Sequence, residues 1–405
     1  MAKRRVAITG MGLITPYGMG TEVFWDGLLA GRSAVRPAEG FDLGGMPITH
    51  YAQLPALDFA SYLDPQQTAL WGEASKVAVV GGILAAGDAG RDTFAPDRTG
   101  VILGTGYGGA YEFEEHYGVF FERGWKRLKP AAVPKMMQNA PASHLAIRFG
   151  ARGVNFTVST ACSSGAIAAG LAAQQIRAGA LDACFTGGVD RMITASIAAI
   201  WNALRVLSPR PDPTASRPFS ADRGGLVLGE GCAMFVLEEW EAARARGAHI
   251  HAEVLGVGAT NDAKSIVGPD PTGEIEAIRL ALDDAGLGPK DIDYVNAHGT
   301  GTAANDANES RILKEVFGAH ARNIPVSSIK GHIGHTMGAA GALDLAATAL
   351  ALRHQRVPPT LHHTPGDPDC DLDYVTEGAR EVELRHAMTN SFGFGGQNSV
   401  LVLGR

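Results

Sequence analysis

The chain has 405 residues, of which 45% are hydrophobic and 19% are charged, a balance that excludes a disordered or fibrous protein. Its formal net charge of −7 at pH 7 and its lack of a long Lys/Arg run argue against a nucleic-acid partner. No apolar run is long enough to span a membrane, and the start, MAKRRVAITG, lacks the apolar stretch of a signal peptide. The 4 cysteines are far apart and form no CxxC pair, which favours reduced thiols and a cytoplasmic location.

Short β-branched segments alternate with Ala-rich helical stretches along the chain. The first strand is expected at RVAIT (5–9), and further strands are expected at 99–106, 183–188, 233–239, 251–258, 293–299, 324–330 and 399–404. This alternation predicts an α/β fold with layers of helices and sheets.

The length suits two core-bearing units of comparable size. A charged helix ending at Gly247 separates two predicted strands, so we place the boundary there and expect units 1–248 and 249–405. Two small-residue stretches, 163–179 after Cys162 and 336–355 after His335, predict buried helices at equivalent places in two related halves. Such Ala-rich and Gly-rich helices by themselves indicate only core packing.

Two patterns resemble binding sites without their full residue sets. GTGYGG (104–109) fits GxGxxG, but the basic cluster Lys126, Arg127 and Lys129 follows where a dinucleotide site needs an acidic residue, so tight turns are the better interpretation. The histidine pairs at 249 and 251 and at 362 and 363 lack a third ligand at suitable spacing. No metal site is expected.

Cys162 lies between a β-rich run, Phe156 to Ser159, and a helix that begins near Ser163. A thiol at a helix N-terminus faces unpaired N–H groups and the positive end of the helix dipole, which stabilise a thiolate nucleophile. An isolated cysteine is more often a small buried apolar residue, so this interpretation needs support from other segments.

Three further segments supply that support. His298 ends a predicted strand before a Gly-rich turn, and Lys330 and His335 stand where another strand gives way to a helix. Phe394 lies in a run with Gly393, Gly395 and Gly396, which can move without steric penalty. Each histidine alone is usually structural, but four such sites in one context indicate a catalytic constellation.

Together, four motifs resemble the β-ketoacyl-ACP synthases of the I/II type in the thiolase superfamily, close to β-ketoacyl-ACP synthase II and to type II polyketide ketosynthases. They are TACSSG (160–165), NAHGTGT (296–302), KGHIGH (330–335) and NSFGFGGQN (390–398), and the resemblance covers essentially the whole chain. It implies a duplicated thiolase fold with five layers, αβαβα, in a protein that is usually dimeric. The first half supplies the nucleophile and the second half supplies both histidines.

The resemblance also implies a mechanism. Cys162 takes an acyl group from an acyl carrier protein, and the backbone N–H groups of Cys162 and Phe394 stabilise the oxyanion. His298 and His335 stabilise the enolate that forms as malonyl-carrier protein loses carbon dioxide, and this enolate attacks the acyl group. No cofactor is implied beyond the phosphopantetheine arm of the carrier.

The remaining assignments rest on the same resemblance. Lys330 orients the site, and we expect Glu309 to be its buried partner. Thr300 and Thr302 hold the phosphopantetheine arm, and Phe394 beside Gly395 acts as a gate. The acyl tail is expected to pass two bulky side chains, Phe113 and Trp201.

Carrier docking needs a local positive surface because acyl carrier proteins are strongly acidic. The densest basic cluster is GWKRLKP (124–130), so Lys126, Arg127 and Lys129 are predicted to bind the carrier. The stretch 62–78, which carries several basic residues in many relatives, has only Lys76 here. Fatty-acid synthesis and type II polyketide or polyene synthesis therefore both stay open, as a homodimer or as a heterodimer with a chain-length-factor subunit.

Two other functions are weighed against the synthase. A non-decarboxylating thiolase that acts on coenzyme A esters is disfavoured by His335, because those enzymes use a different third residue. A non-catalytic partner subunit that only shapes the product cavity is disfavoured by Cys162, because such subunits lack the nucleophile.

Overall fold

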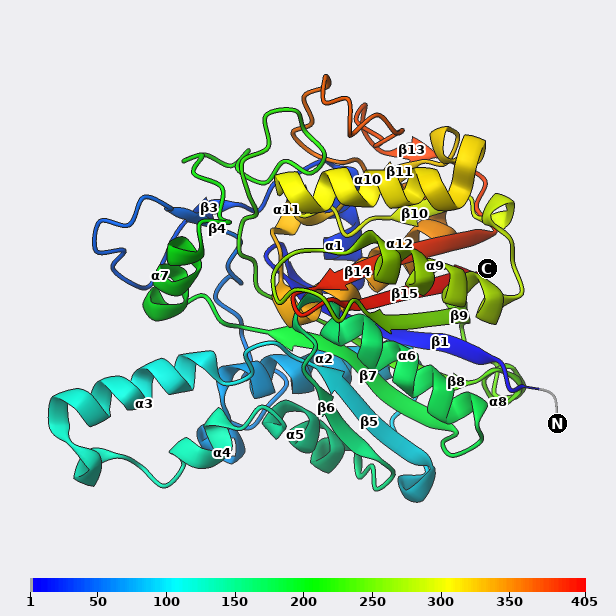
Figure 1. Ribbon diagram of the computed structural model, residues 1–405. Coiled ribbons are helices and arrows are strands. Elements are labelled where there is room, and N and C mark those ends of the chain that lie inside the picture. The colour runs from blue at the N-terminus through cyan, green and yellow to red at the C-terminus, as the bar shows by residue number, and fades with distance from the viewer. Residues whose placement is uncertain (1–2) are drawn as a thin grey trace.

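The computed structural model describes residues 3–405, and most of its strands form one continuous mixed sheet, beside two small two-stranded sheets, β3-β4 and β12-β13 (Figure 1). Along this 11-stranded sheet the strand order is β11-β10-β14-β15-β9-β1-β8-β7-β5-β6, and β2 pairs with β1 off this path.

The sheet consists of two repeats with the same strand order. The first repeat contains β1 (Val6–Thr15), β5 (Thr99–Gly104), β6 (Asn155–Val158), β7 (Ala183–Asp190) and β8 (Gly231–Glu239). The second repeat contains β9 (Ala252–Asn261), β10 (Tyr294–Asn296), β11 (Val326–Ser327), β14 (His386–Gly393) and β15 (Gln397–Gly404). In each repeat the third, second, fourth, fifth and first strands are neighbours in that order, with the same parallel and antiparallel pairings. This identity of topology confirms the duplicated fold.

The two repeats join through β1. This strand pairs antiparallel with β8, where Ala7 lies opposite Glu238, and also with the start of β9, where Ala7 lies opposite Glu253. The two halves therefore share a continuous sheet rather than forming two unconnected ones.

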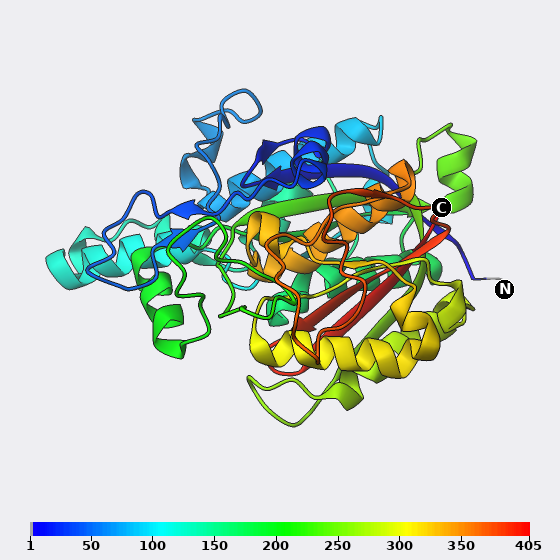
Figure 2. The ribbon, with the colours of Figure 1, turned by 90° about the horizontal axis from the view of Figure 1, so that it is seen from above.

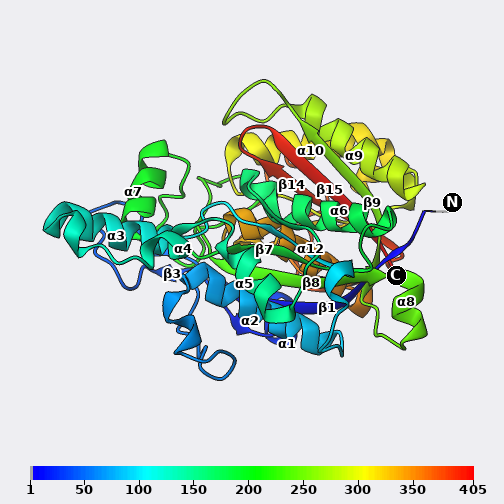
Figure 3. The ribbon, with the colours of Figure 1, turned by 90° about the horizontal axis from the view of Figure 1, so that it is seen from below.

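Helices complete five layers, which Figures 2 and 3 show from above and below. Helices α6 (Ser164–Arg177) and α12 (Ala340–His354) contact each other and lie between the two halves of the sheet. Helices α2 (Glu73–Asp88) and α5 (Ala140–Phe149) cover the first half, while α9 (Pro271–Ala285) and α10 (Ala303–Phe317) cover the second. The expected αβαβα arrangement is confirmed.

Small residues let the central helices approach their neighbours closely. A Cβ atom on Gly165 of α6 would lie 2.9 Å from the Cβ of Ala342 in α12. A Cβ on Gly104, at the end of β5, would lie 2.4 Å from the backbone nitrogen of Gly165. Larger side chains would push α6 away from both layers, so the small-residue pattern serves core packing and also fixes the start of α6.

The remaining elements surround this core. They are β2 (Gly18–Met19), α1 (Thr21–Leu29), β3 (Arg36–Pro37), β4 (His50–Tyr51), α3 (Ala110–Arg123), α4 (Ala132–Met136), α7 (Ala195–Leu204), α8 (Trp240–Ala245), α11 (Lys330–Ile333), β12 (Arg356–Val357) and β13 (Arg380–Glu381). Helices α3 and α7 extend to one side of the sheet (Figure 1). Within residues 3–405, no helix has the length and apolarity needed to cross a membrane.

Candidate active site

Cys162 sits in a sharp turn between β6 and α6. The turn includes a short 3₁₀ segment, Ala161–Ser163, in which Ala161 has the left-handed φ of 51°. The Ser164 hydroxyl donates to the Ala161 carbonyl at 2.6 Å and accepts from the Thr160 N–H at 2.8 Å. These bonds hold the strained turn and place Cys162, which is 6% exposed, at the start of α6.

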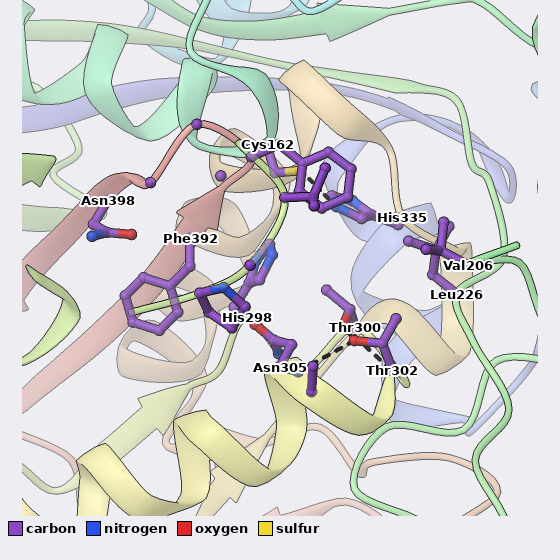
Figure 4. Close-up of a pocket in the computed structure, with 18 of the residues that line it drawn as sticks. Cys162, Val206, Leu226, His298, Thr300, Thr302, Asn305, His335, Phe392 and Asn398 are labelled. Carbon is purple, nitrogen blue, oxygen red and sulfur yellow. Dashed lines mark hydrogen bonds between the residues drawn. The ribbon is translucent and has the colours of Figure 1, made fainter. Parts of the chain in front are cut away.

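His335 reaches Cys162 from the other repeat. Its Nε2 atom lies 3.0 Å from the Cys162 sulfur, as the dashed line in Figure 4 marks. Its Nδ1 atom accepts a hydrogen bond from the Met337 N–H at 3.3 Å. Because an acceptor Nδ1 carries no proton, the neutral ring carries its proton on Nε2. His335 therefore presents an N–H donor to the sulfur and to any substrate carbonyl there.

His298 follows β10 and completes the cluster. Its ring lies edge-on to that of His335, with the centroids 5.3 Å apart, and it also meets Phe392 at 6.0 Å. Burial first, and then the charge of Lys330, hold the pKa values of His298 and His335 well below 6.5. Both rings are therefore neutral at physiological pH.

Glu309 positions the backbone beneath His298. Its carboxylate accepts the N–H groups of His298 at 2.9 Å and Gly299 at 2.8 Å, together with the Asn390 side-chain amide at 3.1 Å. Its contacts thus fix the start of the Gly-rich turn.

The expected pairing of Lys330 with Glu309 is wrong. The Lys330 ammonium donates to Asp344 of α12 at 2.9 Å, and both side chains are buried. Glu309 is occupied by backbone N–H groups instead, and Asp344 follows Lys330 by fourteen positions, on the helix that begins after His335. Helix α12 therefore supplies the counter-ion from the layer between the two half-sheets.

Removing one member of this ion pair should strongly destabilise the fold. We expect Lys330→Met to lower the free energy of unfolding by about 3–5 kcal/mol, because it leaves the buried Asp344 charge without a partner. The double variant Lys330→Met/Asp344→Leu should recover most of that loss, whereas Lys330→Met/Glu309→Gln should not. Urea unfolding measures all three, and recovery by the Glu309 change would contradict the assignment.

Burial dominates the titration of the Cys162 thiol. Desolvation raises its pKa to about 11, although Lys330 and the N–H groups of Phe394 and Cys162 favour the thiolate. The expected thiolate at the helix N-terminus is therefore outweighed by burial, and the resting residue is a thiol. The backbone N–H groups of Phe394 and Cys162 are thus close enough to the sulfur to favour its charged form.

Comparison with known proteins identifies the family. The family model "Beta-ketoacyl synthase, N-terminal domain" matches residues 3–243, and "Beta-ketoacyl synthase, C-terminal domain" matches residues 251–364. The chain belongs to the β-ketoacyl synthases. It is thus an acyltransferase-class enzyme, as its sequence motifs predicted.

Individual ketosynthases match over their full lengths. A Streptomyces cyaneus protein named as a polyketide β-ketoacyl synthase is 42% identical over 414 residues, which cover 99% of this chain and 98% of that protein. The 3-oxoacyl-[acyl-carrier-protein] synthase 2 of a Synechocystis strain is 39% identical, with coverage of 99% and 98%. The solved structure of the ishigamide ketosynthase/chain length factor superposes with a TM-score of 0.93 at 36% identity, over 100% of this chain and 99% of that one.

A cavity of about 300 Å³ opens beside the ketosynthase cluster (Figure 4). Its wall includes Cys162, His298, His335, Thr300, Thr302, Trp201, Leu204, Val206, Leu226, Phe392 and Phe394. The apolar side chains among them suit an acyl chain, and the two threonine hydroxyls lie 2.9 Å apart at another part of the wall.

Phe113 lies outside this cavity wall, and its place beside the acyl tail stays a prediction. It belongs to α3, where its ring packs on Tyr117 with the centroids 5.7 Å apart. Trp201 does line the cavity, and its indole N–H donates a hydrogen bond to the Tyr107 hydroxyl at 2.8 Å. Sequence reasoning missed Tyr107 because it lies in GTGYGG, which drew attention only as a glycine turn.

Phe394 and its glycines form a loop over the cavity. The Phe394 ring stacks on Trp201, with the centroids 6.0 Å apart and the planes 18° from parallel. Gly395 has a φ of 84° and donates its N–H to the Ile266 carbonyl at 2.7 Å. A short hydrogen-bonded connection therefore links this loop to the segment before α9.

The basic cluster predicted for carrier docking lies away from the cavity wall. Lys126 and Arg127 are in the 3₁₀ segment after α3, Lys129 follows, and all three are exposed. Lys126 lies over the Trp125 ring, with Nζ 5.8 Å from its centroid.

The spacing of Cys162, His298 and His335 could also suggest a metal site. Their ligand atoms lie within 4.8 Å of one another. However, a metal ligand needs a free lone pair on the imidazole nitrogen and usually donates its other N–H to an acceptor. His335 has the opposite arrangement, because Nδ1 accepts from Met337 and Nε2 carries the proton. The hydrogen bonding therefore suits substrate binding rather than metal ligation.

Proposed function

We propose that this β-ketoacyl synthase elongates an acyl group bound to Cys162 with a malonyl unit carried by an acyl carrier protein. One observation carries the assignment of residues. A buried thiol from the first repeat meets two neutral imidazoles from the second, and His335 Nε2 lies 3.0 Å from the sulfur.

Acylation is the first step. The Cys162 sulfur attacks the thioester carbonyl of the acyl carrier, and its proton leaves with the released carrier thiol. Two backbone N–H groups, those of Cys162 and Phe394, stabilise the tetrahedral oxyanion. Because the resting thiol has a raised pKa, the thiolate forms only during this attack.

Condensation follows when malonyl-carrier protein enters. His298 and His335 donate N–H groups to the malonyl thioester oxygen and stabilise the enolate formed as the carboxyl group leaves as carbon dioxide. The new carbanion attacks the acyl carbonyl, a carbon–carbon bond forms, and the carbon–sulfur bond to Cys162 breaks. The carrier then holds a β-ketoacyl chain, and the enzyme needs no cofactor of its own.

Several residues position these groups. Burial and the positive charge of Lys330, which is paired with Asp344, keep the imidazoles neutral, and Glu309 holds the backbone of His298. Thr300 and Thr302 bind the phosphopantetheine arm. Phe394 beside Gly395 is the gate between the arm channel and the acyl pocket, and Trp201 bounds that pocket.

The proposed partners follow from the names of the relatives and from exposed aromatic side chains on the surface. We propose that the protein works with an acyl carrier protein, since its relatives include a 3-oxoacyl-[acyl-carrier-protein] synthase. A second subunit, identical or of the chain-length-factor type, covers the exposed aromatic rings along α3, Tyr117, Phe120 and Phe121. The four free cysteines suit a cytoplasmic enzyme, and we place its two units at 1–248 and 249–405.

The two alternative functions are not favoured. The family models that match residues 3–243 and 251–364 are those of β-ketoacyl synthases, and the polyketide and 3-oxoacyl relatives both match over 98% of their length. A purely scaffolding subunit is disfavoured because the nucleophile and both imidazoles are present in one cavity.

Charge reversal tests the docking surface. We expect Lys126→Glu/Arg127→Glu/Lys129→Glu to raise the KM for acyl-carrier substrates, with a larger effect at low salt because salt screens exposed charges. Activity with short pantetheine thioesters should hardly change, because these need only the cavity. Equal losses with both substrate types would mean that the cluster supports the active site, and unchanged carrier kinetics would place docking elsewhere.

A further inference from the structure

The segment Gly299–Ala303 carries the two threonines proposed to bind the pantetheine arm. Two charged side chains outside the cavity wall hold the second half of this segment. We propose that Arg223 and Asp306 are positioning residues that set the threonine hydroxyls for the arm. This inference rests on the proposed function of Thr300 and Thr302.

Asp306 holds the segment from within the fold. It lies in the first turn of α10 and is completely buried. One carboxylate oxygen accepts the Gly301 N–H at 3.2 Å, and the other accepts the Phe219 N–H at 2.7 Å. Gly301 has a φ of 80° and Phe219 a φ of 59°, both in the left-handed region. The carboxylate thus stabilises two backbone conformations that L-amino acids rarely adopt.

Arg223 binds the next residues of the same segment. Its Nε donates to the Thr302 carbonyl and its Nη2 to the Ala303 carbonyl, each at 3.3 Å. Its Nη1 donates to the Ser220 carbonyl at 2.9 Å and to the Asp367 carboxylate. The guanidinium is 7% exposed and lies 3.9 Å from Asp306. A planar fork is needed to reach these acceptors together, which the single ammonium of lysine cannot do.

The two hydroxyls depend on this backbone for their direction. Thr302 is the N-cap of α10, where its hydroxyl oxygen accepts the Asn305 N–H at 3.4 Å. It also lies 2.9 Å from the Thr300 hydroxyl. A tilt of the segment would misdirect both groups, and displacements of about 1 Å are enough to weaken a positioned contact severely.

The turn is therefore held by two separate sets of charges. Glu309 accepts the N–H groups of His298 and Gly299, at the catalytic end. Arg223 and Asp306 bind the backbone from Gly301 onward, at the arm-binding end. Damage to the second set should consequently weaken arm binding while leaving the chemistry at Cys162 intact.

Acylation of Cys162 by two donors tests this separation. For Arg223→Lys we expect the KM for octanoyl-pantetheine to rise about tenfold, equivalent to about 1.4 kcal/mol, with kcat nearly unchanged. Acylation by p-nitrophenyl octanoate, which has no pantetheine arm, should keep its wild-type rate. Arg217→Lys is the matched control, because Arg217 precedes Arg223 by six residues but donates its side-chain hydrogen bonds to Asp222, Thr214 and Thr364.

A double-mutant cycle separates positioning from general destabilisation. If Arg223 acts through Thr302, the KM effects of Arg223→Lys and Thr302→Val should be strongly non-additive, whereas a merely structural effect adds. Should Arg223→Lys fail to fold, Asp306→Asn tests the same contacts. An unchanged KM for octanoyl-pantetheine, or equal losses with both donors, overturns the inference. If Thr300→Ala and Thr302→Val leave that KM unchanged, the proposed arm site itself is wrong.

Discussion

Replacing Cys162 by alanine should lower chain elongation by at least about 10⁴-fold, because the enzyme then has no group to carry the acyl chain. The variant should fold normally, since the change removes only one sulfur atom from a side chain that lines a cavity. A coupled assay of elongated acyl-carrier product measures the loss.

Cys232→Ala is the matched control. Cys232 is also buried, but it pairs with Ile14 in the register of β1 and β8 and belongs to a different core cluster. It should retain wild-type turnover. Elongation above background by Cys162→Ala would refute the assignment of the nucleophile.

Replacing either His298 or His335 by alanine should cost about 10²–10³-fold in malonyl decarboxylation, the usual effect of removing one oxyanion donor. Acyl transfer to Cys162 should persist in both variants, because we propose that backbone N–H groups, and not these histidines, bind the oxyanion of that step. Release of labelled carbon dioxide and acyl loading are measured separately.

His332→Gln is the control for these variants. His332 precedes His335 by three residues, but its Nε2 faces the Pro359 carbonyl at 2.7 Å rather than the cavity. It should affect stability more than decarboxylation. Normal carbon dioxide release in His298→Ala or His335→Ala would contradict the enolate assignment.

Much of the fold was predictable from patterns of β-branched and small residues. The expected strands at 99–106, 183–188 and 399–404 correspond to β5, β7 and β15. The strand β14 was missed, because its buried centre contains Thr389, Asn390 and Ser391 rather than apolar residues. A pattern of hydrophobic residues does not reveal a buried strand whose central side chains are polar.

The site was predictable to the extent that its motifs are local. Cys162, His298 and His335 come together as expected, although they derive from three separated segments. The partner of Lys330 was not predictable, because either Asp344 or Glu309 could reach it until the packing of α12 was known. The place of Phe113 relative to the acyl chain stays a prediction, because Phe113 lies on α3 and outside the wall of the cavity.

The most direct test of the central claim is the mass of the intact protein after incubation with an acyl-carrier protein. We predict one acyl adduct, located on Cys162 by peptide mapping, which disappears when malonyl-carrier protein is added while a β-ketoacyl-carrier product forms. An acyl adduct on another residue, or an adduct on Cys162 that malonyl-carrier protein does not discharge, would contradict the account.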